Sequence, residues 1–293
     1  MILSKKIRCL PTKEQMIIFK KASGTTRFVY NLMISENKKL YNNHLQSKEN
    51  GKSPFINGYD FGKYITELKK LPEYSWLSEV SSKVAKQACL DCDNAFKRFF
   101  KKLSNFPKFK KKGIKDSFYV RYDSIKATQR GFKCEKLREI KTSEPIPKAD
   151  KYYNPHIVYD GKYWYITFGI DVPEKINENN SGKTLGIDLG IKTFATASDG
   201  TVIPNINKSR KPKSVYRKIK YFQRKLNRCK KGSNNRIKVV KKLQLLHRTL
   251  RCIRSNYIHQ ATTMLVKTKP VKIVIECLNV LGMLKNRKLS RAI

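Results

Sequence analysis

The sequence predicts an α+β fold with more than one domain, and three observations lead to this prediction. Residues 1–10 alternate loosely between polar and apolar side chains, which indicates a strand. Residues 13–40 and 81–103 carry apolar side chains at helical spacing, and segments rich in Tyr and Phe follow them. From residue 181 onward, short apolar strands enclose two long helical segments. A β-domain with inserted helices should therefore precede a smaller α/β domain with a helical hairpin.

Two helices are predicted in the first part of the chain. In residues 13–40 the apolar residues at helical spacing are Met16, Phe19, Phe28 and Leu32. From Ser81 to Leu103 one apolar face consists of Val84, Ala88, Cys92, Phe96, Phe99 and Leu103. Cys89 and Cys92 form the only CxxC pair, and a tetrahedral zinc site needs a second pair of ligands that the sequence does not offer. We expect Cys92 in the core and keep zinc binding as a minor alternative.

The following region is predicted to consist of strands. It begins after Phe106 and Pro107 with a basic run made of Lys108, Lys110, Lys111, Lys112 and Lys115. A hairpin is predicted at the Asp160-Gly161 turn, with alternating side chains from Tyr163 to Phe168. These aromatic side chains could stack on bases, or they could fill the core of a small β-barrel. Because the helices come before these strands, residues 1–10 should pair with a strand beyond residue 106.

A polar boundary at residues 174–182 separates the second domain from the first. Thr184–Asp188 and Thr193–Ala197 predict two strands of a three-stranded meander, with a turn at Asp199-Gly200. Two amphipathic segments joined through residues 232–235 predict a helical hairpin. Residues 271–275 then predict a buried strand that ends on Glu276.

Charge and composition restrict the function classes. The chain has 64 Lys and Arg against 22 Asp and Glu, a formal charge of +42, and this excess predicts a polyanionic partner. No signal peptide and no run of about 18 apolar residues is present, so we expect neither secretion nor membrane insertion. Seven scattered cysteines in a chain of this size predict free thiols in a reducing cytoplasm.

Two carboxylates stand out as candidates for chemistry. Between Thr201 and Ile293, 26 Lys and Arg occur with a single acid, Glu276, which follows an apolar strand. Asp188 also follows an apolar strand, and Gly186 and Gly190 flank it. Two carboxylates at one edge of a sheet can hold Mg²⁺ for phosphoryl chemistry. The alternative is that Glu276 forms an ion pair with a neighbouring lysine.

Two motifs suggest other chemistries, and their context excludes both. Gly182-Lys183-Thr184 resembles the end of a phosphate-binding loop, but the first glycine of that motif would fall on Asn177, and a strand follows instead of preceding it. The four histidines form no close pair of the kind that marks a single-strand transposase. The sequence also shows no specific Ser-His-Asp or Cys-His pattern.

Several segments together resemble the TnpB/OrfB family of insertion-sequence proteins, which are regarded as ancestors of type V CRISPR effectors. The segment from Gly186 to Gly190 and the segment from Phe194 to Gly200 resemble the first RuvC motif of that family. The resemblance extends over nearly the whole chain, through the following segments: Pro11-Thr12, Gln15, Arg27–Asn31, Phe106–Lys110, Gly161–Trp164, Ile275–Val280 and Leu289–Ile293.

The resemblance implies a specific domain arrangement. A split wedge β-barrel would comprise residues 1–11 and 106–180, and a helical recognition domain with a helix-turn-helix-like start would comprise residues 12–105. An RNase-H-like RuvC domain, incomplete at its C-terminus, would comprise residues 181–293, with the helical hairpin at residues 212–268.

The resemblance also implies an RNA-guided DNA endonuclease that binds guide RNA and target DNA, in the cytoplasm and on the nucleoid. Asp188 and Glu276 would be catalytic residues that bind Mg²⁺. The residues expected to bind nucleic acid are Arg27, Tyr30, Asn31, Lys108, Lys110, Lys111, Lys112, Arg217, Lys220, Arg224 and Lys225.

The chain departs from the family pattern at its end. Family members continue into a zinc ribbon and a third catalytic Asp, whereas these 293 residues offer no acid after Glu276. We therefore expect no zinc, impaired cleavage, and a bare strand edge with exposed apolar side chains. One alternative is an inactive RNA-guided DNA-binding protein, and another is a basic RNA-packaging or ribosome-associated protein.

Overall fold

The structure is a computed structural model that describes residues 1–47, 55–113, 116–173 and 182–286. Contacts within the chain divide it into two compact units, Met1–Glu174 and Lys175–Ile293. Most of the predicted boundary segment 174–182 lies outside the described residues.

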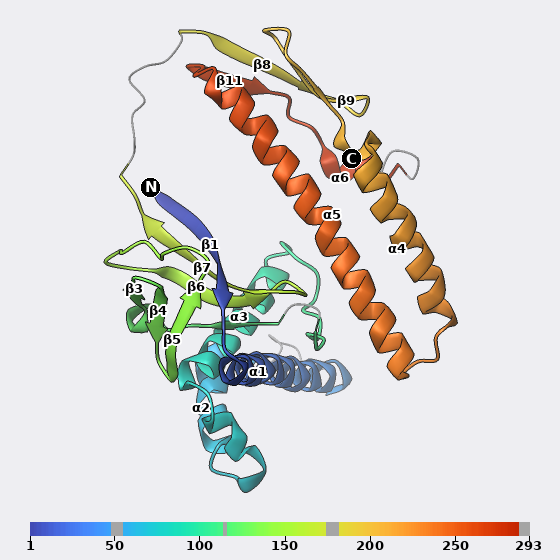
Figure 1. The fold of residues 1–293 in the computed structure, drawn as a ribbon. Coiled ribbons are helices and arrows are strands. Elements are labelled where there is room, and N and C mark those ends of the chain that lie inside the picture. Colours follow the sequence, from blue (N-terminus) through green and yellow to red (C-terminus); the bar gives the residue numbers. More distant parts are fainter. Residues whose placement is uncertain (48–54, 114–115, 174–181, 287–293) are drawn as a thin grey trace. The chain divides into compact units, whose positions relative to one another are not determined.

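The first unit contains a seven-stranded antiparallel sheet (Figure 1). Its strands are β1 (Ile2–Leu10), β2 (Ser117–Tyr119), β3 (Lys126–Thr128), β4 (Gly131–Cys134), β5 (Leu137–Thr142), β6 (Tyr153–Tyr159) and β7 (Trp164–Asp171). Their order is β2-β6-β7-β1-β5-β4-β3, so hydrogen-bonded pairing among the described residues leaves β2 and β3 as edges. Among these residues the hydrogen-bonded strand order is therefore open, with β2 and β3 at its two ends.

The N-terminal strand occupies the middle of this sheet. β1 pairs with β7 from Ile2 opposite Asp171 to Cys9 opposite Trp164, and its end also pairs with β5. This confirms the prediction that residues 1–10 pair with a strand beyond residue 106.

The alternation predicted for the aromatic strand is also confirmed. Trp164, Ile166 and Phe168 of β7 are buried in the core. Tyr163 and Tyr165, which alternate with them, contact cations of β1. The Arg8 guanidinium lies 3.6 Å from the centre of the Tyr163 ring, and the Lys6 ammonium lies 4.4 Å from the centre of the Tyr165 ring. The hairpin turn before β7 has Gly161 at φ +98°, and the carboxylate of Asp160 accepts hydrogen bonds from the backbone amides of Lys162 and Tyr163.

Three α-helices pack in the first unit: α1 (Lys13–Ser47), α2 (Gly58–Leu68) and α3 (Ser82–Phe100), with a 3-10 helix at Pro72–Ser78. Phe19 and Val84 join the core of the sheet, which fastens α1 and α3 to it. A second core lies among the helices and includes Cys89 and Cys92, both fully buried. Cys92 is thus a core residue, as predicted.

The third helix ends earlier than its apolar pattern predicts. Lys102 adopts a left-handed conformation with φ +58°, and the Leu103 amide bonds to the Arg98 carbonyl while the Lys102 amide bonds to that of Phe99. This is the hydrogen-bond pattern of a Schellman C-cap. Leu103 consequently lies outside the helix and is exposed, although the pattern placed it on the apolar face.

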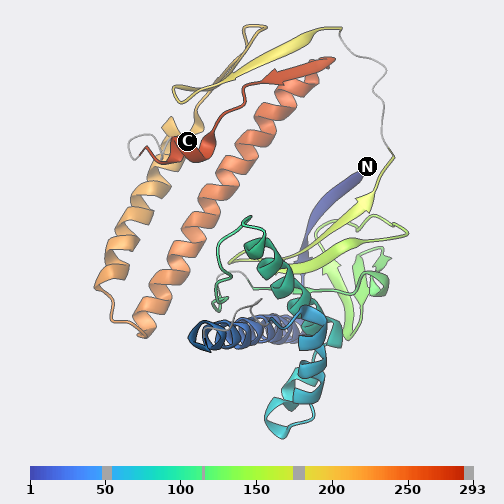
Figure 2. The same ribbon diagram turned by 180° about the vertical axis from the view of Figure 1, so that it is seen from behind.

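The second unit combines a four-stranded sheet with a long helical hairpin, as Figure 2 shows. The strands β8 (Thr184–Leu189), β9 (Thr193–Ala197), β10 (Val202–Pro204) and β11 (Lys272–Ile275) are ordered β10-β9-β8-β11. The first three form the predicted meander, and β11 runs parallel to β8. The hairpin consists of α4 (Arg210–Arg228) and α5 (Asn234–Lys267), and a short α6 (Val280–Leu284) follows β11.

One face of this sheet packs on α5. Leu185 and Ile187 of β8 share a core with Ala261 and Leu265 near the C-terminal end of that helix. A separate apolar seam holds α4 against α5 through Ile219, Val239, Leu243 and Leu250. Within the described ranges, no helix is long and apolar enough to cross a lipid bilayer.

The last strand is an exposed edge. β11 pairs with β8 on one side, and no described strand pairs with its other side. Ile273, Val274 and Ile275 are 42%, 47% and 60% exposed, although the sequence pattern predicted a buried strand. Within the described residues, β11 is thus an apolar edge of its sheet.

Candidate metal centre and nucleic-acid interface

Asp188 and Glu276 each come directly after the last paired residues of the parallel strands β8 and β11. The register of β8 and β11 ends with Ile187 opposite Ile275, so Asp188 and Glu276 are the next residues of their chains. Residues opposite one another on neighbouring strands project from the same face. Because Ile187 is buried against α5, Asp188 projects from the opposite face of the sheet.

Both carboxylates are exposed. Neither forms an ion pair within the part of the chain that the structure describes, so the alternative in which Glu276 pairs with a lysine finds no support there. Gly186 precedes Asp188 by two residues on the same face, and its amide donates to Ser198 Oγ at 3.0 Å. Gly186 therefore adds no side chain of its own to the face beside Asp188.

These two acids suit Mg²⁺ in their chemistry, because this ion prefers carboxylate oxygens and keeps several waters or phosphate oxygens in its shell. No group of three or more His, Cys, Asp or Glu residues with the placement of a metal site occurs among the described residues. Asp199 is the other acid of residues 182–293, and its carboxylate accepts a hydrogen bond from the Thr201 amide in the turn after β9, which lowers its pKa.

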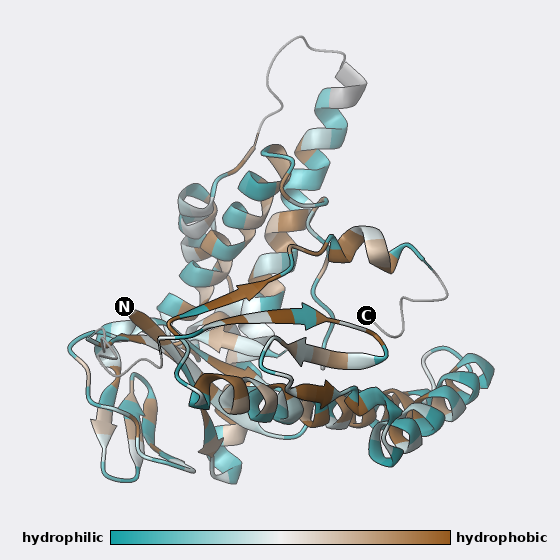
Figure 3. Cartoon of the chain, turned by 90° about the horizontal axis from the view of Figure 1, so that it is seen from above, coloured by the Kyte–Doolittle hydropathy of each residue, from teal (hydrophilic) through white to brown (hydrophobic). Residues whose placement is uncertain are grey.

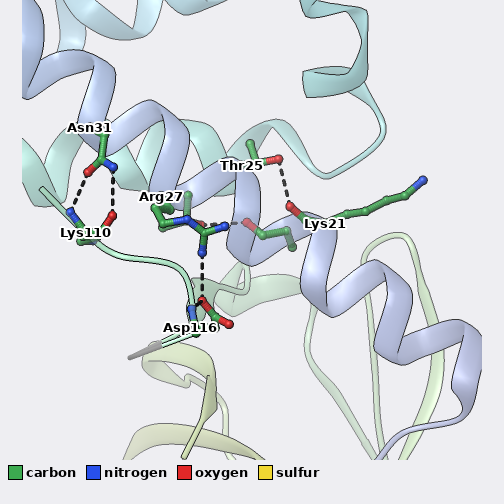
Figure 4. Close-up of polar contacts among 9 residues, drawn as sticks. Lys21, Thr25, Arg27, Asn31, Lys110 and Asp116 are labelled. Carbon is green, nitrogen blue, oxygen red and sulfur yellow. Dashed lines mark hydrogen bonds and ion pairs between the residues drawn. The ribbon is translucent and has the colours of Figure 1, made fainter. Parts of the chain in front are cut away.

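A group of α1 side chains holds the segment that follows α3, as Figure 4 shows. The Arg27 guanidinium forms an ion pair with Asp116 at 2.9 Å, and about four-fifths of each side chain is buried. The side-chain amide nitrogen of Asn31 donates to the Lys110 backbone carbonyl at 3.0 Å, and the side-chain oxygen of Asn31 accepts from the Lys110 backbone amide at 2.8 Å. Asn31 thus binds the backbone of residue 110 as a neighbouring strand would. We call Arg27, Asn31 and Asp116 the α1 clamp.

Tyr30 and Lys110 form a cation–π contact in the same region. The Lys110 ammonium lies 3.8 Å from the centre of the Tyr30 ring. Burial lowers the pKa of Lys110 and raises that of Tyr30 to about 12. Tyr30 is only 8% exposed and belongs to the core among the helices.

The residues predicted to bind nucleic acid in the first unit therefore fall into two groups. Arg27, Tyr30, Asn31 and Lys110 make contacts within the protein, while Lys108, Lys111 and Lys112 are exposed. Sequence reasoning missed Asp116, the partner of Arg27. A signal for it exists, because Asp116 directly follows the basic run that ends at Lys115.

The helical hairpin of the second unit presents a basic surface. Arg217, Lys220, Arg224 and Lys225 of α4 are all exposed, as expected for contacts to a polyanion. They lie away from the apolar seam that contains Ile219. The hydropathy colouring of Figure 3 shows many hydrophilic residues along the helices of the hairpin. Sequence from Thr201 to Ile275 contains no acid, so no carboxylate of this stretch neutralises the surface.

Known proteins with related sequences fall into one group. Residues 167–287 match the OrfB_IS605 family, described as "Probable transposase", and residues 1–46 match HTH_OrfB_IS605, described as "Helix-turn-helix domain". "Putative RNA-guided DNA endonuclease InsQ" of Escherichia coli (strain K12) is 30% identical over 284 residues, covering 96% of this chain and 67% of that protein. "Putative RNA-guided DNA endonuclease" of Streptomyces pristinaespiralis is 30% identical over 296 residues, covering 98% and 70%.

A solved structure shares the fold. The chain aligns with a protein in "Cryo-EM structure of the Cas12f1-sgRNA-target DNA complex" with a TM-score of 0.50 and 13% sequence identity. The alignment covers 96% of this chain and 67% of that chain. At this identity the likeness concerns the fold alone.

Proposed function

The chain belongs to the TnpB/OrfB family of insertion-sequence transposases and RNA-guided DNA endonucleases, and from this premise we propose that it binds a guide RNA with its DNA target and carries a RuvC-type nuclease centre. The observation that carries the second part is the parallel register of β8 and β11, which ends one residue before Asp188 and Glu276. The exposed cations of α4 and of residues 108–112 support the first part.

In this proposal the units divide the work. Residues 1–11 and 106–180 form the wedge domain, and residues 12–105 form the recognition domain. The shared core of Phe19 and Val84 with the sheet supports a rigid connection between those two parts. Residues 181–293 form the nuclease domain, with the hairpin at residues 212–268 as a contact surface for phosphates.

Asp188 and Glu276 would hold Mg²⁺, which supplies activation of water and stabilisation of the leaving oxygen at a phosphodiester. The protein's own contribution is to leave Asp188 and Glu276 without an ion pair among the described residues, at the ends of two neighbouring strands, while cations elsewhere bind the nucleic-acid backbone. This separation matters, because a lysine paired with either carboxylate would compete with the metal ion.

The test uses a polypeptide of these 293 residues with guide RNA, target DNA and Mg²⁺. We expect target binding, and we expect Asp188→Ala to leave that binding unchanged or slightly tighter, because it removes a negative charge near phosphates. Asp188→Ala and Glu276→Ala should each weaken the binding of Mn²⁺, which is measured by paramagnetic relaxation enhancement. Asp199→Ala is the matched control, since it removes an exposed acid of the same unit. Equal metal binding by all three variants would contradict the proposed centre.

A second candidate is an RNA-guided DNA-binding protein without nuclease activity. The observation in its favour is that no group of three or more His, Cys, Asp or Glu residues that could hold a metal ion occurs among the described residues. Cleavage measured in the same experiment separates the two. Binding with negligible cleavage favours the second candidate for these 293 residues, whereas robust cleavage that is lost in Asp188→Ala favours the nuclease.

A further inference from the structure

Phe109 is a large apolar side chain on the surface of a strongly basic segment. Its side chain is 50% exposed, and Lys108, Lys111 and Lys112 around it are exposed as well. Single exposed apolar residues are common on proteins. Phe109 differs from them because the backbone on both sides of it is fixed.

The anchor on the N-terminal side is apolar. The Phe106 ring lies 5.5 Å from that of Phe96 and 5.3 Å from that of Phe99, both in edge-to-face geometry, and Pro107 is buried. These contacts attach the start of residues 106–112, which we call the basic loop, to the core among the helices.

The anchor on the C-terminal side is the α1 clamp. Asn31 holds both backbone groups of Lys110, and Arg27 holds Asp116, whose carboxylate also accepts from the Gly113 amide at 3.3 Å. The Lys110 side chain turns inward onto Tyr30. With residues 107 and 110 facing the protein, residues 108 and 109 face outward between two fixed points.

We propose that Phe109 is a stacking platform for an unpaired nucleobase, and that Asn31 and Arg27 are positioning residues for it. This inference rests on the proposed function, since it assigns a substrate class, single-stranded nucleic acid, to one part of the basic surface. An aromatic ring stacks on any base face, and neighbouring lysines bind the phosphates on either side. A fixed backbone lowers the entropy that the loop loses when it binds.

The test measures binding of the full chain to an oligonucleotide that carries 2-aminopurine, as single-stranded RNA in one arm and single-stranded DNA in the other. Phe109→Ala should weaken binding about 5- to 150-fold in at least one arm. It should leave the dependence on salt unchanged, because no charge is lost. Phe109→Tyr should restore binding and the quenching of 2-aminopurine. Tyr59→Ala, at a 65% exposed aromatic residue of α2, is the matched control and should bind like the wild type.

The positioning role has its own test, a double-mutant cycle. Asn31→Ala should weaken binding in the wild-type background and have little further effect in the Phe109→Ala background, because both act through the same ring. Additive effects of the two substitutions would overturn the positioning role.

The outcomes separate this inference from the proposed function. Wild-type protein that binds neither oligonucleotide contradicts both. Wild-type protein that binds while Phe109→Ala binds equally well overturns the inference alone. A melting temperature that falls in Phe109→Ala would also overturn it, because the ring would then be a packing residue.

Discussion

Not every basic residue of this chain is free to bind a polyanion. Arg27 and Lys110 are two of the 64 Lys and Arg residues of the chain, and both contact the protein itself: Arg27 forms an ion pair with Asp116, and Lys110 lies over the Tyr30 ring. Exposed ion pairs such as Lys39 with Glu36 contribute little to stability because water and salt screen them. The largely buried pair of Arg27 with Asp116 contributes more to stability, because removing one partner leaves the other charge without a counter-charge.

The α1 clamp gives the first prediction. Asp116→Ala removes the acidic partner of the largely buried Arg27 guanidinium, so it should lower the free energy of unfolding by about 1–3 kcal/mol. Urea denaturation of the full chain measures this difference. Lys39→Ala, which breaks an exposed pair, is the control and should cost about 0.5 kcal/mol. Equal losses in both variants would contradict the assigned role of the clamp.

The thiols give the second prediction. Burial raises the pKa of Cys9, Cys89, Cys92 and Cys134 to about 12 each, while Cys252 and Cys277 are exposed. Only thiolates react with iodoacetamide, so at pH 8 the two exposed cysteines should be alkylated and those four protected. Peptide mass spectrometry reads out each site, and denatured protein is the control.

The direction of the same pKa shifts fixes a pH dependence. A raised pKa favours the neutral thiol in the folded state, so its contribution to stability is complete below the ordinary value of 9.0. That contribution is lost as the pH rises from 9 toward 12. Rapid alkylation of Cys89 or Cys92 in native protein at pH 8 would show that the core among the helices opens easily.

At the scale of elements, the spacing of apolar residues predicted those strands and helices that depend on local sequence. The alternation of β7, the meander of β8 to β10 and the two helices of the hairpin follow from apolar spacing alone. The end of α3 did not follow, because Lys102 adopts a left-handed conformation that the apolar pattern does not encode. The open order of the seven-stranded sheet could not be read either, since it depends on which strands pair across long distances.

The candidate site divides in the same way. Asp188 and Glu276 were visible as acids at strand ends in a basic sequence, and a parallel register relates them. The roles of Arg27 and Asn31 were hidden, because their partners lie 89 and 79 residues away in the chain. A sequence motif shows which residues belong together, but it does not show whether a polar side chain faces the ligand or the protein.

The helical hairpin gives the third prediction. If α4 binds phosphates, neutralising Arg217, Lys220 and Arg224 to Ala should reduce the slope of log affinity against log salt by about 0.9 for each lost contact with duplex DNA. Filter binding between 50 and 200 mM salt measures the slope. Lys63→Ala on α2, where Asp60 already pairs with the lysine, is the control. An unchanged slope in the triple variant would exclude α4 from the interface.

The exposed edge of β11 gives the fourth prediction. Unpaired strand edges with apolar side chains promote association between chains. Val274 lies opposite Gly186, so Val274→Lys adds a charge where the neighbouring strand has no side chain to disturb. We expect less self-association in light scattering, with an unchanged melting temperature. Ile237→Lys adds the same charge on an exposed site of α5 and should have a smaller effect.

At the scale of the whole molecule, the charge of +42 gives the last prediction. Repulsion among so many cations destabilises the compact state, and salt screens it over a Debye length of about 10 Å at 0.1 M. The melting temperature of the free protein should therefore rise with added NaCl.

A bound polyanion should reverse that trend. Ligand binding stabilises the folded state in proportion to the logarithm of ligand concentration over Kd, and Kd for nucleic acid increases steeply with salt. With saturating oligonucleotide the melting temperature should be highest at low salt and should fall until it meets the curve of the free protein. Differential scanning fluorimetry records both curves, and dextran at equal mass concentration is the uncharged control. If the melting temperature of the free protein falls with salt, native ion pairs stabilise the fold more than repulsion among the cations destabilises it. A bound polyanion would then not stabilise the fold by reducing that repulsion.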